Sequence, residues 1–159
     1  MGDGIAVELR LERLVRADDE RLLSVFPRVF SGSLDQDHID AVNRLGFDAA
    51  WCRVLDDLLT ADPVEWIRLA FDPAGDCVGV VAGDVVGGRA GFVTFVGVAE
   101  AFRGRGYGRQ LLAAMTREHV SKGATTLIAD TDTQNWPMGK AFADVGWLQT
   151  ESRLDFARV

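Results

Sequence analysis

Arginine and glycine alternate in one short segment, and this combination is typical of a binding site for a phosphate group. The segment reads Arg103-Gly104-Arg105-Gly106-Tyr107-Gly108-Arg109. Glycine lets the backbone come close to a ligand because no Cβ atom intervenes, and arginine keeps its positive charge at physiological pH. The segment follows a predicted strand and opens a predicted helix, whose first N–H groups and dipole favour an anion. We therefore expect a pyrophosphate to bind here.

Two familiar classes of phosphate-binding loop do not fit this segment. A dinucleotide-binding loop needs its third glycine at position 109, where this chain has arginine. A P-loop needs Gly-Lys followed by Ser or Thr, and that combination is missing. A plain glycine turn would not explain three arginines in a chain whose net charge is −7. The segment thus predicts another kind of pyrophosphate site.

Cysteine and histidine are further reactive side chains, and their spacing predicts no metal site. The two cysteines, Cys52 and Cys77, lie far apart in the sequence, and His38 and His119 stand outside any cluster of ligand-type residues. We expect reduced, partly buried thiols and no bound metal.

The bulk composition predicts one globular domain over residues 1–159, with 48% hydrophobic and 26% charged residues. No apolar run is long enough for a membrane span, and the N-terminus does not resemble a secretory signal, so we expect a cytoplasmic protein without membrane contact. The net charge of −7 argues against a nucleic-acid partner. An acidic chain suits a cationic substrate such as an amine, although solubility alone explains many acidic proteins.

The first half of the chain predicts one strand followed by helices. Apolar residues alternate with polar ones over residues 5–11, as in a half-buried strand. Asp18 and Asp19 are suited to cap a first helix. A second helical stretch covers residues 35–59 and is interrupted near Gly46.

The second half predicts an antiparallel meander and then alternating helices and strands. Turn sequences separate three apolar runs, at 64–71, 77–83 and 90–98. After the glycine-rich segment we expect a helix at 109–122 that ends at Gly123, a strand at 125–130, and a helix at 137–145 that ends at Gly146. The last dozen residues are again strand-like. This order predicts one α/β domain with a mixed sheet.

Two motifs in this part resemble signatures of the GNAT superfamily of N-acetyltransferases. Arg103, Gly106 and Gly108 match its Gln/Arg-x-x-Gly-x-Gly/Ala signature, after a strand that ends in Val96-Gly97-Val98. A later segment resembles the family's Asn-x-x-Ala-x-x-Leu-Tyr-x-x-x-Gly-Phe block through Asn135, Met138, Ala141, Phe142, Gly146 and Trp147. The resemblance covers residues 90–148 well. It implies a single α/β (α+β) domain whose central mixed, mostly antiparallel sheet is flanked by helices and splays between its fourth and fifth strands, at 90–98 and 125–130.

The same resemblance implies acetyl-CoA as the co-substrate and assigns the residues that bind it. Backbone groups of Val96 and Val98, with Gly97 between them, should bind the pantetheine arm like an added strand. N–H groups of the pyrophosphate segment should hold the diphosphate: Arg103, Gly104, Arg105, Gly106, Tyr107, Gly108 and Arg109. Asn135 should contact the pantetheine or the thioester end, and Phe142 should line the thioester.

Acid–base groups are the part of the site where the sequence departs from the family. Some members place a base six residues before the valine that corresponds to Val98, but here that position is Phe92. Others place it five residues before the asparagine, which makes Asp130 the candidate base, unless Asp130 or Asp132 only caps the following loop or helix. Thr94 could orient a water molecule. The family's tyrosine acid is Phe142 here, so we expect water to protonate the leaving thiolate.

The expected function is transfer of an acetyl group from acetyl-CoA to a primary amine, on a small molecule or a protein N-terminus, by direct attack in a ternary complex. The alternative is a non-catalytic module that binds acyl-CoA as a regulator or sensor. Transfer of a longer acyl group is a third, weaker reading. The short remainder at 148–159 either closes the sheet as one long strand or leaves its completion to a second copy, which would imply a homodimer.

Overall fold

The computed structural model describes residues 5–61, 64–131 and 135–148, which form seven strands and five α-helices. In chain order they are β1 (Arg10–Arg13), α1 (Glu20–Phe30), α2 (Gln36–Leu45), α3 (Phe47–Ala61), β2 (Ile67–Phe71), β3 (Cys77–Ala82), β4 (Val85–Val86), β5 (Ala90–Phe92), β6 (Phe95–Val98), α4 (Tyr107–Ser121), β7 (Thr126–Ile128) and α5 (Trp136–Val145). Two 3-10 turns, Val64–Trp66 and Glu100–Phe102, precede β2 and the glycine-rich segment.

The strands form two sheets. One has four antiparallel strands in the order β1-β2-β3-β6, and the other has three in the order β4-β5-β7. In the second sheet β4 and β5 are antiparallel, whereas β5 and β7 are parallel. Mostly antiparallel pairing with one parallel pair confirms the predicted mixed α/β domain.

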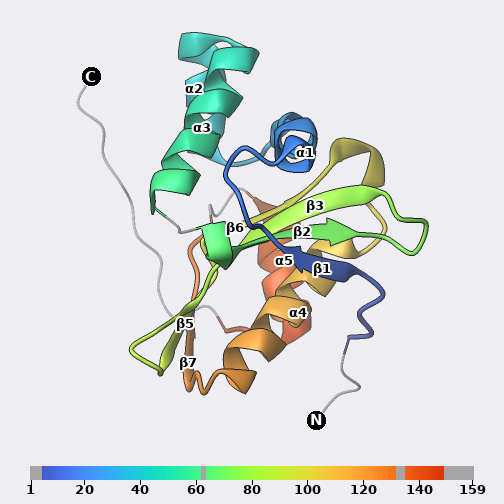
Figure 1. The fold of residues 1–159 in the computed structure, drawn as a ribbon, viewed down its shortest axis with the longest axis vertical. Coiled ribbons are helices and arrows are strands. Elements are labelled where there is room, and N and C mark those ends of the chain that lie inside the picture. Colours follow the sequence, from blue (N-terminus) through green and yellow to red (C-terminus); the bar gives the residue numbers. More distant parts are fainter. Residues whose placement is uncertain (1–4, 62–63, 132–134, 149–159) are drawn as a thin grey trace.

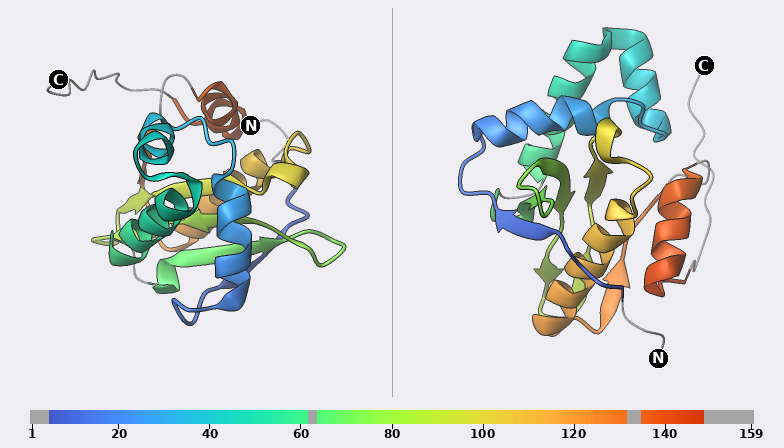
Figure 2. Two further views of the ribbon diagram at one scale, coloured as in Figure 1. Left: turned by 90° about the horizontal axis from the view of Figure 1, so that it is seen from above. Right: turned by 90° about the vertical axis from the view of Figure 1, so that its right-hand side faces the viewer.

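Helices cover both faces of the four-stranded sheet, as Figure 1 and the two turned views of Figure 2 show. On one face α1 contacts β3 and β6, and α3 packs on α1 with α2 beside it. On the other face α4 contacts β3, β5 and β6, and α5 packs on α4. Strand β2 shows the alternation that this arrangement needs: Leu69 belongs to the core under α1, and the next residue, Ala70, belongs to the core under α4.

The two sheets separate inside the segment 90–98. Val93 donates its N–H to the carbonyl of Ile128 at 3.0 Å, whereas Thr94 donates to the carbonyl of Ala82 at 2.9 Å. The backbone therefore changes partner from β7 to β3 between two consecutive residues. The predicted single strand over 90–98 was wrong, because it consists of β5 and β6. The predicted splay lies at this change of partner.

Side chains at the helix ends explain why the helices begin and end where they do. Asp19 accepts a hydrogen bond from the N–H of Arg21 at the start of α1, and Asp35 accepts two at the start of α2. Gly46 and Gly146, both with positive φ, end α2 and α5. The predicted helix boundaries are thus confirmed to within a few residues, including the interruption at Gly46.

The first strand is shorter than predicted and lies later in the chain. Instead of covering 5–11, β1 begins at Arg10, which pairs with Phe71. Phe71 is the last residue of β2, so earlier residues have no partner strand on that side. The predicted alternation still describes which side chains are buried, since Leu9 is buried and Leu11 packs against the core under α4. The strand predicted over the last dozen residues lies outside the described residues.

Candidate functional site

The glycine-rich segment forms the turn into α4 and leaves the start of that helix without a side-chain cap. Its N-cap residue is Gly106, which has a φ of 78° and offers no acceptor for the first N–H groups. The caps of α1, α2 and α5 do supply a side-chain oxygen. The first N–H groups of α4 are therefore suited to an external acceptor.

Charge at this helix start is the reverse of that at the first three helices. α1, α2 and α3 each have an acidic residue in the first turn, as the helix dipole favours. α4 has none there and has Arg109 instead. A cation at the positive end of a helix is unfavourable by itself, and a bound anion would compensate for it.

Open space lies over two glycines of the segment. A Cβ atom built on Gly104 or Gly108 would meet no other atom within 4 Å. Gly104 also has a φ of 77°, a conformation that other residues rarely adopt. A diphosphate can thus approach the backbone at these positions.

The three arginines of the segment have different surroundings. The Arg103 guanidinium donates to the carbonyls of Val98, Val29 and Ser31 at 3.0, 2.9 and 2.6 Å. Its side chain therefore fixes the loop to β6 and to the end of α1. The diphosphate contact expected of residue 103 concerns its backbone N–H group and stays a prediction. Arg105 and Arg109 are exposed, Arg105 over the ring of Phe102 and Arg109 at 4.0 Å from Asp144.

Strand β6 presents one unpaired edge within the described part of the chain. The Ala99 N–H donates to the carbonyl of Val78, in the register that pairs Gly97 with Val80. Hydrogen-bonded pairs alternate in an antiparallel ladder, so the backbone groups of Val96 and Val98 point away from β3. These are the two residues that were predicted to bind the pantetheine arm.

Gly97 lies between them, and its lack of a side chain is required for packing. An added Cβ would lie 2.1 Å from Cγ1 of Val29 on α1. Gly97 also lines the cavity described below. Helix α1 can therefore approach β6 closely only because residue 97 is glycine.

A cavity of about 160 Å³ lies where the sheets separate. Its floor is the crossing from β5 to β6, over Val93, Thr94, Phe95, Val96 and Gly97. Asp130 and Thr131 line it after β7, and α5 contributes Asn135, Met138 and Phe142. The fold thus brings Thr94, Val96, Gly97, Asp130, Asn135 and Phe142, which the sequence analysis selected, to one cavity.

Two of these side chains have defined contacts. The Asn135 Oδ1 atom accepts from the N–H of Met138 at 3.3 Å and so caps α5, which leaves its amide NH₂ as the group for a ligand. The Phe142 ring packs on the ring of Trp147 with a centroid distance of 5.0 Å. Asn135 therefore supplies donors and Phe142 an apolar wall.

The end of α1 and the start of α2 form the remaining wall, which the sequence analysis missed. It consists of Val29, Phe30, Ser33, Asp35 and His38. The signal in the sequence was weak: a serine and an aspartate suited to capping, followed by a histidine in the first helical turn. Nothing in their spacing showed that this turn would face β7 across the splay.

His38 is half-buried, and burial lowers the pKa of its imidazole, while the nearby carboxylates of Asp35 and Asp37 raise it. The net direction is downward, so the neutral ring is favoured at neutral pH. Its Nδ1 atom lies 2.8 Å from Oγ of Ser33.

The residues present fit coenzyme A on three observations of this chain. An uncapped helix N-terminus with an arginine in its first turn suits the diphosphate. The edge of β6 that no described strand pairs with suits the amide groups of the pantetheine arm, and the carbonyl of Val98 on this edge also accepts from Arg103. The cavity with Asn135 and Phe142 lies at the end of that edge and suits the thioester.

A metal site and a membrane-spanning helix are two further features that the described residues can be checked for. Among the described residues, no group of three or more His, Cys, Asp or Glu side chains could hold a metal ion. No helix within the described ranges has both the length and the apolar composition needed to cross a bilayer.

Comparisons with solved structures agree with this architecture. Aminoglycoside N-acetyltransferase AAC(6′)-Iy in complex with CoA is 21% identical, with a TM-score of 0.58, and the match covers 99% of this chain and 98% of that one. Ard1 from Thermoplasma volcanium is 18% identical, with a TM-score of 0.63 over 91% of this chain and 86% of that one. At such identities the likeness concerns the fold.

Sequence comparisons give the family. A mycothiol acetyltransferase of Corynebacterium aurimucosum is 38% identical over 68 residues, which is 43% of this chain and 22% of the relative's length. This chain thus matches only about a fifth of that relative. The family model described as the acetyltransferase (GNAT) family matches residues 30–147, and with it the pyrophosphate segment, the open edge of β6 and the cavity. The chain therefore belongs to the GNAT family of acetyltransferases, enzymes that use acetyl-CoA.

Proposed function

We propose that this chain transfers the acetyl group of acetyl-CoA to a primary amine, by direct attack of the amine within a ternary complex. The acceptor is a small-molecule amine or the N-terminus of a protein. The observation that carries the proposal is the cavity at the splay, because it adjoins the open edge of β6 and has carboxylates on its walls.

The donor half of the proposal uses the residues that fit coenzyme A. Val96 and Val98 bind the pantetheine arm through their backbone groups, and the N–H groups at the start of α4 bind the diphosphate. Arg105 and Arg109 add positive charge there. Asn135 and Phe142 contact the thioester end, which acetyl-CoA presents as an activated acetyl group.

The acceptor half uses the acidic side of the cavity. Asp35 and Asp130 line it from different elements, and carboxylates attract the ammonium form of an amine. Asp130 stays the sequence-based candidate for a base, and Thr94 the candidate that orients a water molecule. Asp130→Asn, measured beside the wild type, tests the first assignment through the pH dependence of kcat.

The names of relatives support an amine acceptor. One solved structure holds AAC(6′)-Iy with a bisubstrate analogue that joins CoA to acetylneamine. The partial relative is named for mycothiol. Neither name identifies the acceptor of this chain, so an acceptor panel needs several amine classes.

The test follows the release of free thiol from acetyl-CoA in the presence of an aminoglycoside, a peptide with a free N-terminus, and short di- and polyamines. The proposal expects thiol release that depends on one class of amine, with equal amounts of acetylated amine by mass spectrometry. Tight binding of acetyl-CoA without thiol release for any amine would contradict it and favour the non-catalytic sensor. The cytoplasmic location, the homodimer and the lack of nucleic-acid or membrane partners stay predictions.

A further inference from the structure

His38 lies on the wall of the cavity opposite to β7, and both of its sides face a hollow. One is the cavity at the splay, which it shares with Asp130. The other is a more open hollow of about 480 Å³ between α2 and α3. A half-buried imidazole in this position can accept a proton on the cavity side and release it toward solvent.

Contacts on three sides hold the imidazole ring. Its centroid lies 5.1 Å from that of Phe30 on α1 and 6.5 Å from that of Phe95 on β6. Its Nδ1 atom lies 2.8 Å from Oγ of Ser33. Helix α1, strand β6 and the connection before α2 therefore hold the ring of His38.

The contact with Ser33 is compatible with a tautomer in which Nε2 of His38 can take up a proton. The Oγ atom of Ser33 already accepts the N–H of Asp35 at 3.2 Å, and its second lone pair can accept Nδ1–H of His38. With the proton on Nδ1, Nε2 carries the lone pair. After Nε2 takes up a proton, the Nδ1–H···Oγ hydrogen bond persists, so the charged ring keeps its place.

We propose that Nε2 of His38 accepts the first proton of the acceptor ammonium in the acetyl transfer, and this inference rests on the proposed function. Asp130, across the cavity, attracts the ammonium group. The ammonium RNH₃⁺ gives one proton to Nε2, which yields RNH₂ and an imidazolium. The amine nitrogen forms a bond with the acetyl carbon, and the carbon–sulfur bond breaks. The second amine proton passes to water, and water protonates the thiolate. The imidazolium returns its proton to solvent through the α2–α3 hollow.

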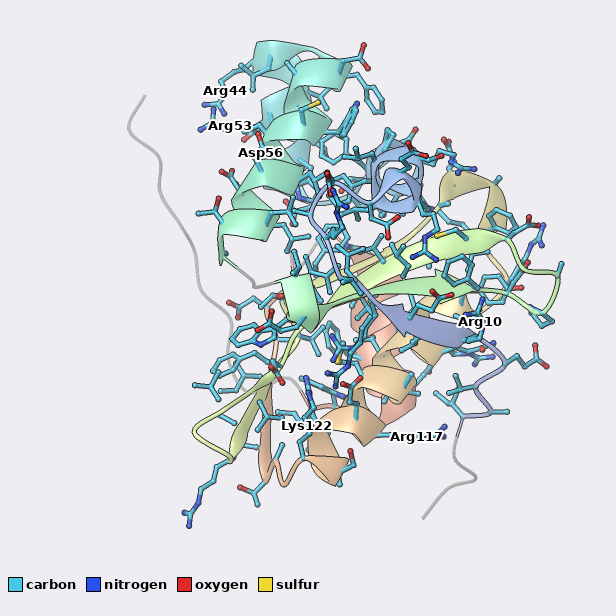
Figure 3. All side chains as sticks on the ribbon, viewed as in Figure 1. Arg10, Arg44, Arg53, Asp56, Arg117 and Lys122 are labelled. Carbon is cyan, nitrogen blue, oxygen red and sulfur yellow. The ribbon has the colours of Figure 1, made fainter. Side chains whose placement is uncertain are left out.

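Charged groups around His38 come from α2 and its cap, from α3 and from the segment after β7. On its own helix and cap these are Asp35, Asp37, Asp40 and Arg44, and across the cavity it is Asp130. On α3 they are Arg53 and Asp57. Figure 3 shows Arg44 and Arg53 beside each other on the outer side of the two helices. Burial favours the neutral ring of His38, whereas Asp35 and Asp37 raise its pKa and so stabilise an imidazolium.

The experiment measures kcat against pH for the wild type and His38→Asn, because kcat reports groups that titrate in the substrate complex. Asparagine keeps a side-chain group near Ser33 but cannot take up a proton. We expect kcat at pH 7 to fall about 100-fold, the acid limb of the profile to flatten, and the affinity for acetyl-CoA to stay the same. His38→Ala should recover activity with added imidazole, which a structural role would not allow.

Control variants separate the possible outcomes. Asp130→Asn should raise KM and keep the acid limb, and Ser33→Ala should shift that limb. If His38→Asn keeps both the wild-type rate and the limb while the wild type acetylates an amine, His38 is not the proton acceptor and the proposed function stands. If the acid limb of kcat against pH flattens for Asp130→Asn and not for His38→Asn, Asp130 is the proton acceptor in place of His38. A wild type that acetylates no amine overturns both proposals.

Discussion

Phe142 illustrates how one residue limits the chemistry of the site. It stands where the family has a tyrosine, lines the cavity, and packs on Trp147. A phenyl ring has no proton to give, and no other tyrosine replaces it, because the single tyrosine, Tyr107, belongs to the pyrophosphate segment. A thiol of pKa about 8.5 leaves readily, so water can protonate the thiolate.

Phe142→Tyr tests this view of the leaving group. We expect the change to alter kcat little or to raise it, since the added hydroxyl supplies a proton that water already supplies. Steady-state kinetics with acetyl-CoA and the accepted amine measure the effect. A loss of about 100-fold, the size seen when an acid–base group is removed, would show that Phe142 has another role.

Single residues were predictable from the sequence where a local pattern determines them. The glycines of the pyrophosphate segment follow from the geometry of a helix start, and Asn135 and Phe142 from a motif of fixed spacing. His38 was not predictable in this way. Its place in the site depends on contacts with Phe30, Phe95 and Ser33, and the two phenylalanines come from other elements.

At the scale of elements, the loop before α4 joins both parts of the site. Arg103 ties this loop to the carbonyls of Val29 and Ser31 at the end of α1 and to that of Val98 in β6. The end of α1 lines the cavity, and β6 supplies the open edge. Arg103 therefore fixes both the shape of the loop and the position of the cavity wall at the end of α1.

Arg103→Ala should lower the free energy of unfolding by about 1–3 kcal/mol, since three carbonyls lose a charged donor. Arg105→Ala is the matched control, because Arg105 contacts only the ring of Phe102 among the interactions of the described residues. It should leave stability unchanged and weaken acetyl-CoA binding. Urea unfolding and calorimetric titration measure the two effects, and equal stability of both variants would contradict the assignment.

Element boundaries were predictable where caps and turns are local, as at Asp19, Gly46 and Gly146. The split of 90–98 into β5 and β6 was not predictable. It depends on the hydrogen bonds of Val93 to Ile128 and of Thr94 to Ala82, which join segments that are distant in the sequence. Periodicity of apolar residues reports burial and carries no information on the partner strand.

At the scale of the whole molecule, the sheet separates two apolar cores, and polar groups are buried beside the core under α4. Arg68 is 2% exposed and pairs with Glu118. The adjacent His119 is fully buried, and neither of its ring nitrogens has a hydrogen-bond partner among the residues that the structure describes. Burial lowers the pKa of His119, so the folded protein resists its protonation.

Stability should therefore fall in mildly acidic solution. A histidine whose pKa is lowered on folding binds more protons in the unfolded state than in the folded state. Above the unfolded pKa of about 6.5 the ring is neutral in both states, so it does not reduce the free energy of unfolding there. As the pH falls below that value, the unfolded state gains protons that the folded state does not. Thermal unfolding between pH 7.5 and 5.5 should show a decreasing midpoint.

His119→Leu removes this titration and the two unsatisfied nitrogens, so it should be more stable than the wild type and less dependent on pH. The remaining dependence comes from His38, whose pKa is also lowered. If the unfolding midpoint of His119→Leu depends on pH as strongly as that of the wild type, groups other than His119 cause the dependence.

The binding of the acetyl-CoA diphosphate at the start of α4 is the claim on which the rest depends. Gly108→Glu tests it most directly. A side chain at this position meets open space, and an acidic residue in the first turn favours the helix by about 0.3–1 kcal/mol, so the protein should fold normally. The same carboxylate would repel a diphosphate. Gly139→Glu is the matched control, because Gly139 likewise lies near the start of a helix and has open space around it, although Gly139 is exposed and Gly108 is half-buried.

Calorimetric titration of acetyl-CoA into the three proteins gives the decisive comparison. We predict that Gly108→Glu raises the Kd at least about 100-fold, or about 2.7 kcal/mol, with an unchanged or higher melting temperature. Gly139→Glu should bind as the wild type does. Equal affinities of the wild type and Gly108→Glu would contradict diphosphate binding at this helix.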